Sequence, residues 1–325
     1  MIKIAKIIDL LAQTEYISGE DLADQLGVTR AAVWKQIEVL RELGYEIKAF
    51  PRKGYLLCSK PDRLYPWEVG KGLNTQLVGK NMEYYDELPS TNLQAKEMLG
   101  SLSEGTVILA ESQTQGRGRL GRNWFSPPGI GIWMSLVLSP KLPPVELPKL
   151  TLVAAVALSR AIFEVLGVRP LVKWPNDLYL NGRKISGILT ELVGEMGRLE
   201  YLILGVGINA NQKLEDFPEE LRDKAGSLAM ICGKQIDRKV LLRRYLELME
   251  EEYFRALQEG FAQALKYCRK YTFTLGRKVV VNGGVKTLSG TAVGIAEDGS
   301  LILEQNGKEF KVITGDVNLI NKEQE

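Results

Sequence analysis

The stretch GRGRLGRNW, residues 116–124, carries two signals at once. Gly116, Gly118 and Gly121 have the G-x-G-x-x-G spacing of a dinucleotide-binding turn, with arginines in the gaps. Such a turn must run from a strand directly into a helix, whose N-terminus holds the pyrophosphate. Here the loop is followed by SPPGIG, in which two prolines and two glycines prevent a helix. The stretch therefore excludes a Rossmann fold and predicts a loop for a different anion.

The cations of this loop are Arg117, Arg119 and Arg122, and no acidic residue neighbours them in the sequence. Each guanidinium offers several donors to a phosphate or carboxylate. Like charges repel one another, so we expect the loop to be disordered when empty and ordered around an anion. A solvated basic loop is the alternative, but Trp124 and Phe125 follow at once, which is unusual for a solvated segment.

Two further segments point to the same site. VKWPNDLYLNGRKISGIL, residues 172–189, places polar and charged side chains around an Asn-Gly hairpin turn, with Gly187 leaving space beside Lys184. In DELPSTNLQAKEML, residues 86–99, Thr91-x-x-Gln94 predicts a capping box at a helix start, where the hydroxyls and Asn92 would line a polar pocket. The alternatives are structural: a packed Trp174-Pro175 corner and a cap without a ligand.

Composition excludes several kinds of chemistry. The chain has 325 residues, a formal net charge of +2 and 45% hydrophobic residues, which favours two or three globular domains. It has no histidine, so Ser-His and Cys-His nucleophiles and imidazole zinc sites are excluded. Its three cysteines form no C-x-x-C pair, and we expect no fixed metal site. With no signal peptide or membrane span in the pattern, a cytoplasmic protein without membrane contact is expected.

The first 60 residues predict a winged helix-turn-helix DNA-binding domain. Apolar spacing gives three helices, with Ser18 and Thr29 as N-caps, and YEIKAF and GYLL flank PRKG as a wing. Cations occupy the reading helix and the wing tip, where phosphate and base contacts are made. A small helical module without a DNA role is the alternative. The predicted DNA-binding residues are Gly19 to Glu38, with Arg30, Lys35, Arg52 and Lys53 as named contacts.

The rest of the chain predicts a linker and two more domains. Residues 61–75 carry prolines and mixed polarity, as linkers do. Residues 76–270 alternate buried strands with long helices, and residues 271–325 have short strands joined by glycine turns. We therefore predict a multidomain α+β protein with a central α/β domain on a mixed sheet and a small C-terminal β-barrel.

Taken together, these motifs resemble the bifunctional biotin–protein ligase and biotin operon repressor family over essentially the whole chain. The resemblance rests on STN at 90–92, GRGRLGRNW at 116–124, KWPNDLYLNGRK at 173–184 and GVGIN at 205–209, in that order. It implies a class II synthetase-like central domain and an SH3-like C-terminal barrel. It also implies that biotin and Mg-ATP form biotinyl-5′-AMP, which then acylates a lysine of the biotin carboxyl carrier domain of acetyl-CoA carboxylase.

The resemblance also implies roles for individual residues. The catalytic set is Lys184, Arg117, Arg119 and Asp177. The biotin contacts are Ser90, Thr91, Asn92, Gln113, Gly116, Arg117, Gly118, Arg119, Lys184 and Gly187. The ATP and adenylate contacts are Arg119, Arg122, Trp124, Lys173, Asn176, Asp177, Lys184 and Asn209. Leu120 departs from the family pattern, which commonly has arginine there, and this puts one phosphate contact in question.

A regulatory role is implied as well. In the family, biotinyl-5′-AMP is the corepressor, and the adenylate-bound homodimer binds a palindromic operator. Two alternatives stay open. A lipoate–protein ligase would share the fold and the adenylate chemistry, and a biotin-sensing repressor without catalysis would keep the binding residues.

Overall fold

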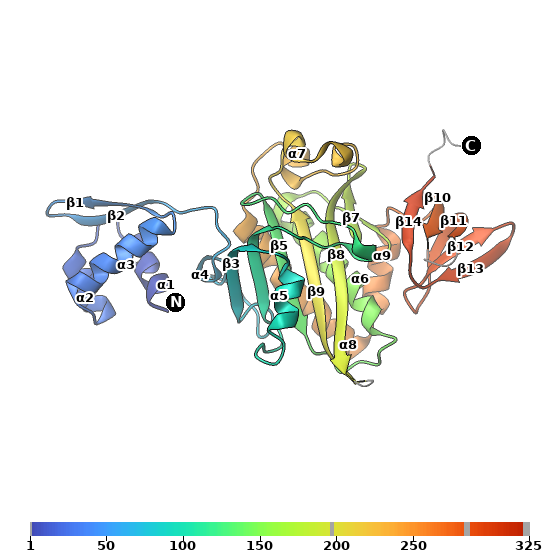
Figure 1. The fold of residues 1–325 in the computed structure, drawn as a ribbon, viewed down its shortest axis with the longest axis horizontal. Helices are drawn as coiled ribbons and strands as arrows, with labels where there is room; N and C mark the ends of the chain where they lie inside the picture. The colour runs from blue at the N-terminus through green and yellow to red at the C-terminus, as the bar shows by residue number, and fades with distance from the viewer. Residues whose placement is uncertain (1, 196–197, 283–286, 321–325) are drawn as a thin grey trace. The chain divides into compact units, whose positions relative to one another are not determined.

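The computed structural model describes residues 2–195, 198–282 and 287–320, so the last five residues of the predicted C-terminal domain lie outside it. The chain divides into two compact units, Met1–Lys71 and Gly72–Glu325 (Figure 1). The predicted boundaries at residues 60, 75 and 270 stay predictions.

The first unit has the predicted winged helix-turn-helix architecture. Its elements are α1 (Ile2–Gln13), α2 (Gly19–Leu26), α3 (Arg30–Glu42), β1 (Glu46–Phe50), β2 (Gly54–Ser59) and α4 (Pro66–Val69). Ser18 Oγ accepts from the backbone N–H of Asp21, and Thr29 Oγ1 accepts from that of Ala32, so both predicted caps are confirmed. Strands β1 and β2 pair antiparallel as the wing.

Part of the segment predicted as a linker packs onto this unit instead. Helix α4 follows Tyr65, whose ring stacks on Trp67 with centroids 4.6 Å apart. Tyr45 donates a hydrogen bond to Glu68 at 2.8 Å and accepts one from the Trp67 indole at 2.8 Å. The prolines of this segment favoured a linker. Its aromatic residues Tyr65 and Trp67 pack against the first unit instead.

The second unit is built on a seven-stranded mixed sheet of order β3-β4-β5-β9-β8-β7-β6. Strands β3 and β4 are parallel and every other neighbouring pair is antiparallel. The strands are β3 (Met82–Leu88), β4 (Val107–Gln113), β5 (Gly131–Leu138), β6 (Leu171–Lys173), β7 (Asp177–Leu180), β8 (Arg183–Glu195) and β9 (Arg198–Asn209). The buried strands predicted within residues 76–270 are thus confirmed.

Helices cover both faces of this sheet. Helix α5 lies on one face, and α6, α8 and α9 lie on the other (Figure 1). The helices are α5 (Thr91–Glu97), α6 (Leu150–Leu166), α7 (Leu228–Cys232), α8 (Arg238–Glu259) and α9 (Ala262–Lys270), with short 3-10 turns at Arg119–Gly121, Leu147–Lys149, Leu214–Asp216 and Glu219–Leu221. At the start of α8, Arg238 is fully buried and pairs with Glu111 of β4 at 3.0 Å.

The C-terminal part is a five-stranded antiparallel sheet of order β13-β12-β11-β10-β14. Its strands are β10 (Lys278–Asn282), β11 (Thr287–Ile295), β12 (Leu301–Gln305), β13 (Lys308–Val312) and β14 (Asp316–Leu319). The Trp174 indole donates to the carbonyl of Gly299 at 2.9 Å, and Thr274 accepts from the Trp174 backbone at 3.0 Å. These bonds join the C-terminal part to the β6–β7 end of the seven-stranded sheet. The SH3-like barrel stays a prediction.

No helix among the described residues is long and apolar enough to cross a membrane.

Candidate active site

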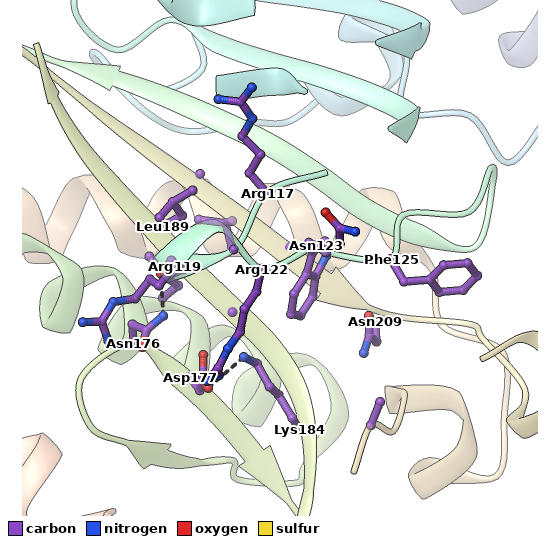
Figure 2. Close-up of a pocket in the computed structure, with 18 of the residues that line it drawn as sticks. Arg117, Arg119, Arg122, Asn123, Phe125, Asn176, Asp177, Lys184, Leu189 and Asn209 are labelled. Atoms are coloured by element: carbon purple, nitrogen blue, oxygen red, sulfur yellow. Dashed lines mark hydrogen bonds and ion pairs between the residues drawn. The ribbon is translucent and has the colours of Figure 1, made fainter. Parts of the chain in front are cut away.

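A cavity of about 500 Å³ opens beside β5, β7, β8 and β9 and is covered by the glycine-arginine loop (Figure 2). The predicted residues that line it are Ser90, Thr91, Asn92, Gln113, Arg117, Gly118, Arg119, Arg122, Trp124, Lys173, Asn176, Asp177, Lys184, Gly187 and Asn209. Gly116, the first residue of the loop, is buried, and a Cβ atom there would lie 2.3 Å from the Trp124 carbonyl oxygen. The structure therefore brings the three sequence motifs together at one cavity.

The β7–β8 hairpin fixes the central charge pair. Asn181 and Gly182 both have positive φ, which is the geometry of a tight hairpin turn. The turn sets Lys184 beside Asp177, with Nζ 2.8 Å from Oδ2. Asp177 Oδ1 is buried and has no hydrogen-bond partner among the described residues. The lining of the cavity therefore includes an ammonium held in an ion pair and a carboxylate with one oxygen that has no hydrogen-bond partner in the described part of the chain.

The glycine-arginine loop is anchored by the C-terminal sheet. Arg122 pairs with Asp316 of β14 at 2.5 Å, so the expectation of arginines without a partner acid is wrong for Arg122. Arg119 donates to the Asn176 side chain at 3.1 Å and to the carbonyl of Gly315 at 3.3 Å. These partners lie far away in the sequence, which is why the local pattern did not reveal them.

Arg117 lies differently from its two neighbours. Its side chain points away from Asp177 and Lys184 (Figure 2) and is exposed. Its charge helps to lower the pKa of Glu191 on β8, so Arg117 acts on that strand rather than on the Lys184–Asp177 pair. Leu120 is exposed at the cavity mouth with φ 56°, a backbone conformation that non-glycine residues seldom adopt.

The Trp124 indole packs against two glycines on neighbouring strands, Gly207 of β9 and Gly187 of β8. A Cβ atom at Gly207 would lie 2.3 Å from the indole Nε1, and one at Gly187 would lie 3.0 Å from its Cζ3. The Lys184 ammonium lies 5.3 Å from the Trp124 ring. The indole Nε1 is buried without a hydrogen-bond partner in the described part of the chain. The absence of side chains at Gly207 and Gly187 thus lets the Trp124 ring pack on the sheet, where it forms the aromatic wall of the cavity.

The predicted capping box at Thr91 is wrong. Ser90 is the N-cap residue and makes no side-chain cap bond. The backbone N–H of Thr91 donates to Gln113 Oε1 at 2.9 Å, and the Thr91 hydroxyl lies 3.2 Å from the same oxygen. A side chain from the neighbouring strand therefore satisfies the helix start, and the Thr91 hydroxyl faces the cavity rather than the helix backbone.

The segment after β9 closes the cavity on the side of Lys184. The Lys184 backbone N–H donates to the Lys224 carbonyl at 2.8 Å, and its carbonyl accepts from Gly226 at 3.0 Å. Asn209 donates to the Gly226 carbonyl at 3.0 Å, so its amide holds this segment. Sequence analysis did not name several lining residues: Tyr179, which lies inside a quoted motif, and Met134, Phe217, Leu221, Lys224, Asp316 and Asn318, which lie outside the site motifs.

Burial and charge set the electrostatics of the site. Burial lowers the pKa of Lys173, against the opposing effect of Asp177, and burial likewise lowers the pKa of Arg119. Burial alone would raise the pKa of Asp316, but Arg122 and Lys173 hold it below its ordinary value. No group of three or more potential metal-ligating side chains is present in residues 2–195, 198–282 and 287–320.

A separate basic surface lies in the first unit. Arg30 and Trp34 of α3 face Arg52 of the wing across a hollow of about 480 Å³. Trp34 is 55% exposed, although it is a large apolar residue. Lys35 and Lys53 are also exposed, and Lys53 Nζ lies 4.9 Å from the Tyr16 ring.

Fold and site together define a ligase with an appended helix-turn-helix domain, and family models agree. Residues 84–209 match the biotin/lipoate A/B protein ligase family, residues 3–56 match an HTH domain and residues 274–319 match the biotin protein ligase C-terminal domain.

Known relatives match over nearly the whole chain. The bifunctional ligase/repressor BirA of Bacillus subtilis (strain 168) is 42% identical over 96% of this chain and 97% of its own length. BirA of Escherichia coli (strain K12) is 35% identical over 98% of this chain and 97% of its own length. The biotin protein ligase from Aquifex aeolicus in complex with biotin and ATP superimposes with a TM-score of 0.67 and 33% identity, covering 75% of this chain and all of that chain. The chain belongs to the bifunctional ligase/repressor family of biotin protein ligases.

Proposed function

We propose that the protein activates biotin with ATP to biotinyl-5′-AMP and pyrophosphate, and then transfers the biotinyl group to a lysine of a biotin carboxyl carrier domain. The observation that carries this proposal is the cationic cavity around the Lys184–Asp177 pair. In the first step a biotin carboxylate oxygen attacks the α-phosphorus of ATP and pyrophosphate leaves. That nucleophile is ionised at neutral pH, so the absence of histidine is no obstacle.

The difficulty of this step is charge, since one anion must approach another. Preorganised cations stabilise the charge that develops in the transition state. Lys184 is held by Asp177 and by the backbone of residues 224–226, and Arg119 is held by Asn176 and Gly315. We assign to these two residues the stabilisation of the α-phosphate, with Arg122 and Lys173 on the nucleotide side.

The second step needs a neutral amine, because a protonated lysine has no lone pair for the acyl carbon. Asp177 lines the cavity, its buried Oδ1 has no hydrogen-bond partner among the described residues, and it is the group we assign to orient the carrier lysine or take its proton. The amine then forms an amide bond to the biotinyl carbonyl, and AMP leaves.

Mg²⁺ would enter with the phosphates of ATP. It prefers oxygen ligands and usually keeps several waters, taking one or two carboxylates from a protein. Asp177 and Asp316 both line the cavity, and Asp177 Oδ1 has no hydrogen-bond partner among the described residues, so the residues present fit such a partial coordination. The metal would neutralise phosphate charge.

The same protein would repress transcription from the cytoplasm. We assign operator binding to the basic hollow between α3 and the wing, with Arg30, Lys35, Arg52 and Lys53 contacting DNA. A homodimer with biotinyl-5′-AMP as corepressor would present two such surfaces to two half-sites. Coupling requires the adenylate to bind the dimer-competent state more tightly.

The decisive experiment incubates the protein with Mg-ATP, an apo carrier domain and either biotin or lipoate, followed by intact-mass spectrometry of the carrier. One biotinyl mass, with lipoate inert, supports the proposal. A lipoyl mass would identify a lipoate–protein ligase instead. Biotin binding by calorimetry without any mass added to the carrier would support the repressor without catalysis.

A further inference from the structure

A chain of hydrogen-bonded polar side chains leads from Thr91 at the cavity through Ser135 and Asn92 to Glu191 of β8, which lies outside the cavity. Glu191 Oε1 accepts from the Lys96 ammonium at 2.6 Å, and Oε2 accepts from Asn92 Nδ2 at 2.7 Å. Asn92 is buried and lines the cavity, whereas Glu191 does not reach it. Glu191 can therefore act on a ligand only through Asn92.

The carboxylate determines which way the Asn92 amide faces. A carboxylate accepts hydrogen bonds and cannot donate them, so Asn92 must turn its NH₂ group toward Glu191. Its second hydrogen lies near the Leu189 carbonyl, at an Nδ2–O distance of 3.4 Å. Burial acts to raise the pKa of Glu191, but the bonds from Lys96 and Asn92 hold it below its ordinary value. The group thus stays an acceptor at neutral pH.

The orientation of the Asn92 amide determines the hydrogen bonds of Ser135, which does not line the cavity, and through Ser135 those of Thr91, which does. Asn92 Oδ1 can only accept, so the Ser135 hydroxyl donates to it at 2.5 Å. Ser135 Oγ lies 2.8 Å from Thr91 Oγ1, and its only hydrogen is already committed to Asn92. Thr91 therefore keeps a lone pair for a ligand N–H group. At Gly205 a Cβ atom would lie 2.3 Å from Asn92 Oδ1, so the amide is also held in place sterically.

We propose that Glu191 is a positioning residue for biotin: by fixing the Asn92 amide, it commits the Ser135 hydrogen to Asn92 and so leaves a lone pair of the Thr91 hydroxyl for the polar end of the substrate. This inference rests on the proposed function. Lys96 holds the carboxylate from the outer side, where its side chain is about one-third exposed, and a methionine there would leave the acceptor on Asn92 intact.

The test compares biotin affinity, measured by calorimetry without ATP, in the full-length wild type and three variants. Glu191→Leu removes the acceptor, and we expect the biotin Kd to rise about tenfold, the typical effect of one buried polar group left without its partner. Glu191→Gln keeps the shape and can still offer an oxygen, so its Kd should lie between those of wild type and Glu191→Leu. Lys96→Met, the matched control, should stay within about twofold, as for a partly exposed ion pair.

Steady-state kinetics separates positioning from a general loss of structure. We expect KM for biotin to rise while KM for ATP stays unchanged, because the chain of bonds does not reach the Lys184 side of the cavity. Equal losses in Glu191→Leu and Lys96→Met would overturn the inference, since the ion pair alone would then matter. So would an unchanged biotin Kd in Glu191→Leu. If Glu191→Leu fails to fold, Glu191→Gln against Lys96→Met gives the same comparison. Failure of the wild type to bind biotin would reject the proposed function itself.

Discussion

Lys184 and Asp177 face each other across the β7–β8 hairpin, with Nζ 2.8 Å from Oδ2, while the other oxygen of Asp177 is buried and has no hydrogen-bond partner among the described residues. Asp177 therefore has one oxygen in the ion pair and one oxygen without a hydrogen-bond partner in the described part of the chain. The cation is fixed for the first step of the reaction and the carboxylate is available for the second.

Replacing Lys184 should slow adenylate formation. We expect Lys184→Arg, which can still pair with Asp177, to lower the rate of biotin-dependent pyrophosphate release by about 10²–10³, because the cation is displaced from the α-phosphate. Lys234→Met removes an exposed lysine outside the cavity and should leave the rate unchanged. A wild-type rate in Lys184→Arg would show that charge alone suffices at this position.

A methyl group at Gly207 should displace the aromatic wall. Its Cβ atom would lie 2.3 Å from Trp124 Nε1, so we expect Gly207→Ala to lower kcat/KM for biotin and ATP by about 10²-fold. Gly187→Ala meets the same ring at 3.0 Å and should lose less. Equal activity of both variants and the wild type would mean that the indole position is unimportant.

The turn between β11 and β12 should lose stability in acid. Hydrogen bonds from Ser300 lower the pKa of Asp298 from 3.8 to about 2. Because the folded pKa is depressed, this contribution is present above pH 3.8 and is lost as the pH falls toward about 2. Asp298→Asn should therefore melt at a lower temperature than the wild type at pH 6, and the difference should shrink toward pH 2 in calorimetric scans. A difference that is constant with pH would exclude this linkage.

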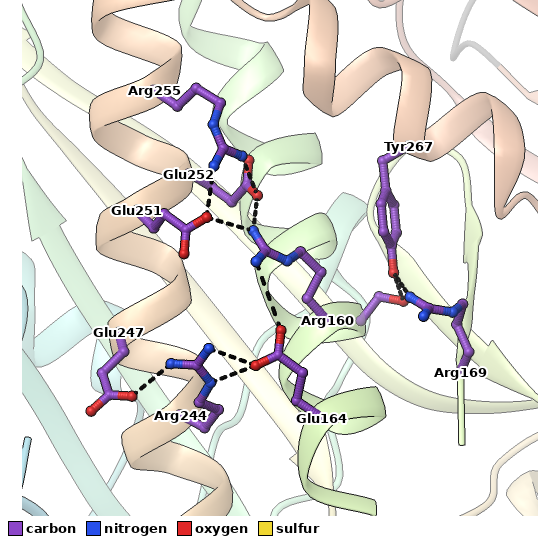
Figure 3. A network of polar contacts seen from close by, with 10 residues as sticks. Arg160, Glu164, Arg169, Arg244, Glu247, Glu251, Glu252, Arg255 and Tyr267 are labelled. Atoms are coloured by element: carbon purple, nitrogen blue, oxygen red, sulfur yellow. Dashed lines mark hydrogen bonds and ion pairs between the residues drawn. The ribbon is translucent and has the colours of Figure 1, made fainter. Parts of the chain in front are cut away.

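Helices α6 and α8 are joined by a network of ion pairs (Figure 3). Arg160 pairs with Glu251 at 3.0 Å and with Glu252, whose side chain is 5% exposed and is also held by Arg255 at 2.8 Å. Arg160→Met leaves this buried carboxylate short of a donor, and we expect about 1–3 kcal/mol of destabilisation in urea unfolding. Arg255→Met should lose less than about 1 kcal/mol, because Arg255 lies on α8 itself and its loss leaves the ion pairs between α6 and α8 in place. Equal losses would contradict a special role for Arg160.

The basic hollow of the first unit should act on DNA alone. We expect Arg30→Ala and Arg52→Ala each to weaken operator binding and, if they contact phosphate, to reduce the slope of log K against log salt by about 1. Fluorescence anisotropy over a salt series measures both effects. Biotin transfer to the carrier should be unchanged, since both residues belong to the unit Met1–Lys71. A normal DNA affinity in both variants would exclude this surface.

Patterns of neighbouring residues predicted the helix caps and the hairpin turn, which depend on local sequence alone. The caps at Ser18 and Thr29 follow from residue type beside a helical repeat, and the Asn181-Gly182 turn follows from its backbone preference. The motifs also predicted which side chains would meet, because the family resemblance places them at one cavity.

Long-range partners could not be predicted in this way. Asp316 is 194 residues from Arg122, and nothing around either residue indicates the other. Thr91 has the residue types of a capping box, but the strand residue Gln113 bonds its backbone instead, and a pattern along one helix contains no information about that strand. Glu191 was missed because it acts through Asn92 from outside the cavity.

The anchoring of the glycine-arginine loop by Thr314, Gly315 and Asp316 has a consequence for biosynthesis. The loop, the hairpin and the strands of the cavity are all translated long before these three residues. A nascent chain still attached to the ribosome therefore lacks one wall of its cavity until β14 has emerged from the exit tunnel. The cavity is therefore complete only after β14 has been made, so that a chain terminated before Thr314 would carry the DNA-binding unit without a finished ligase.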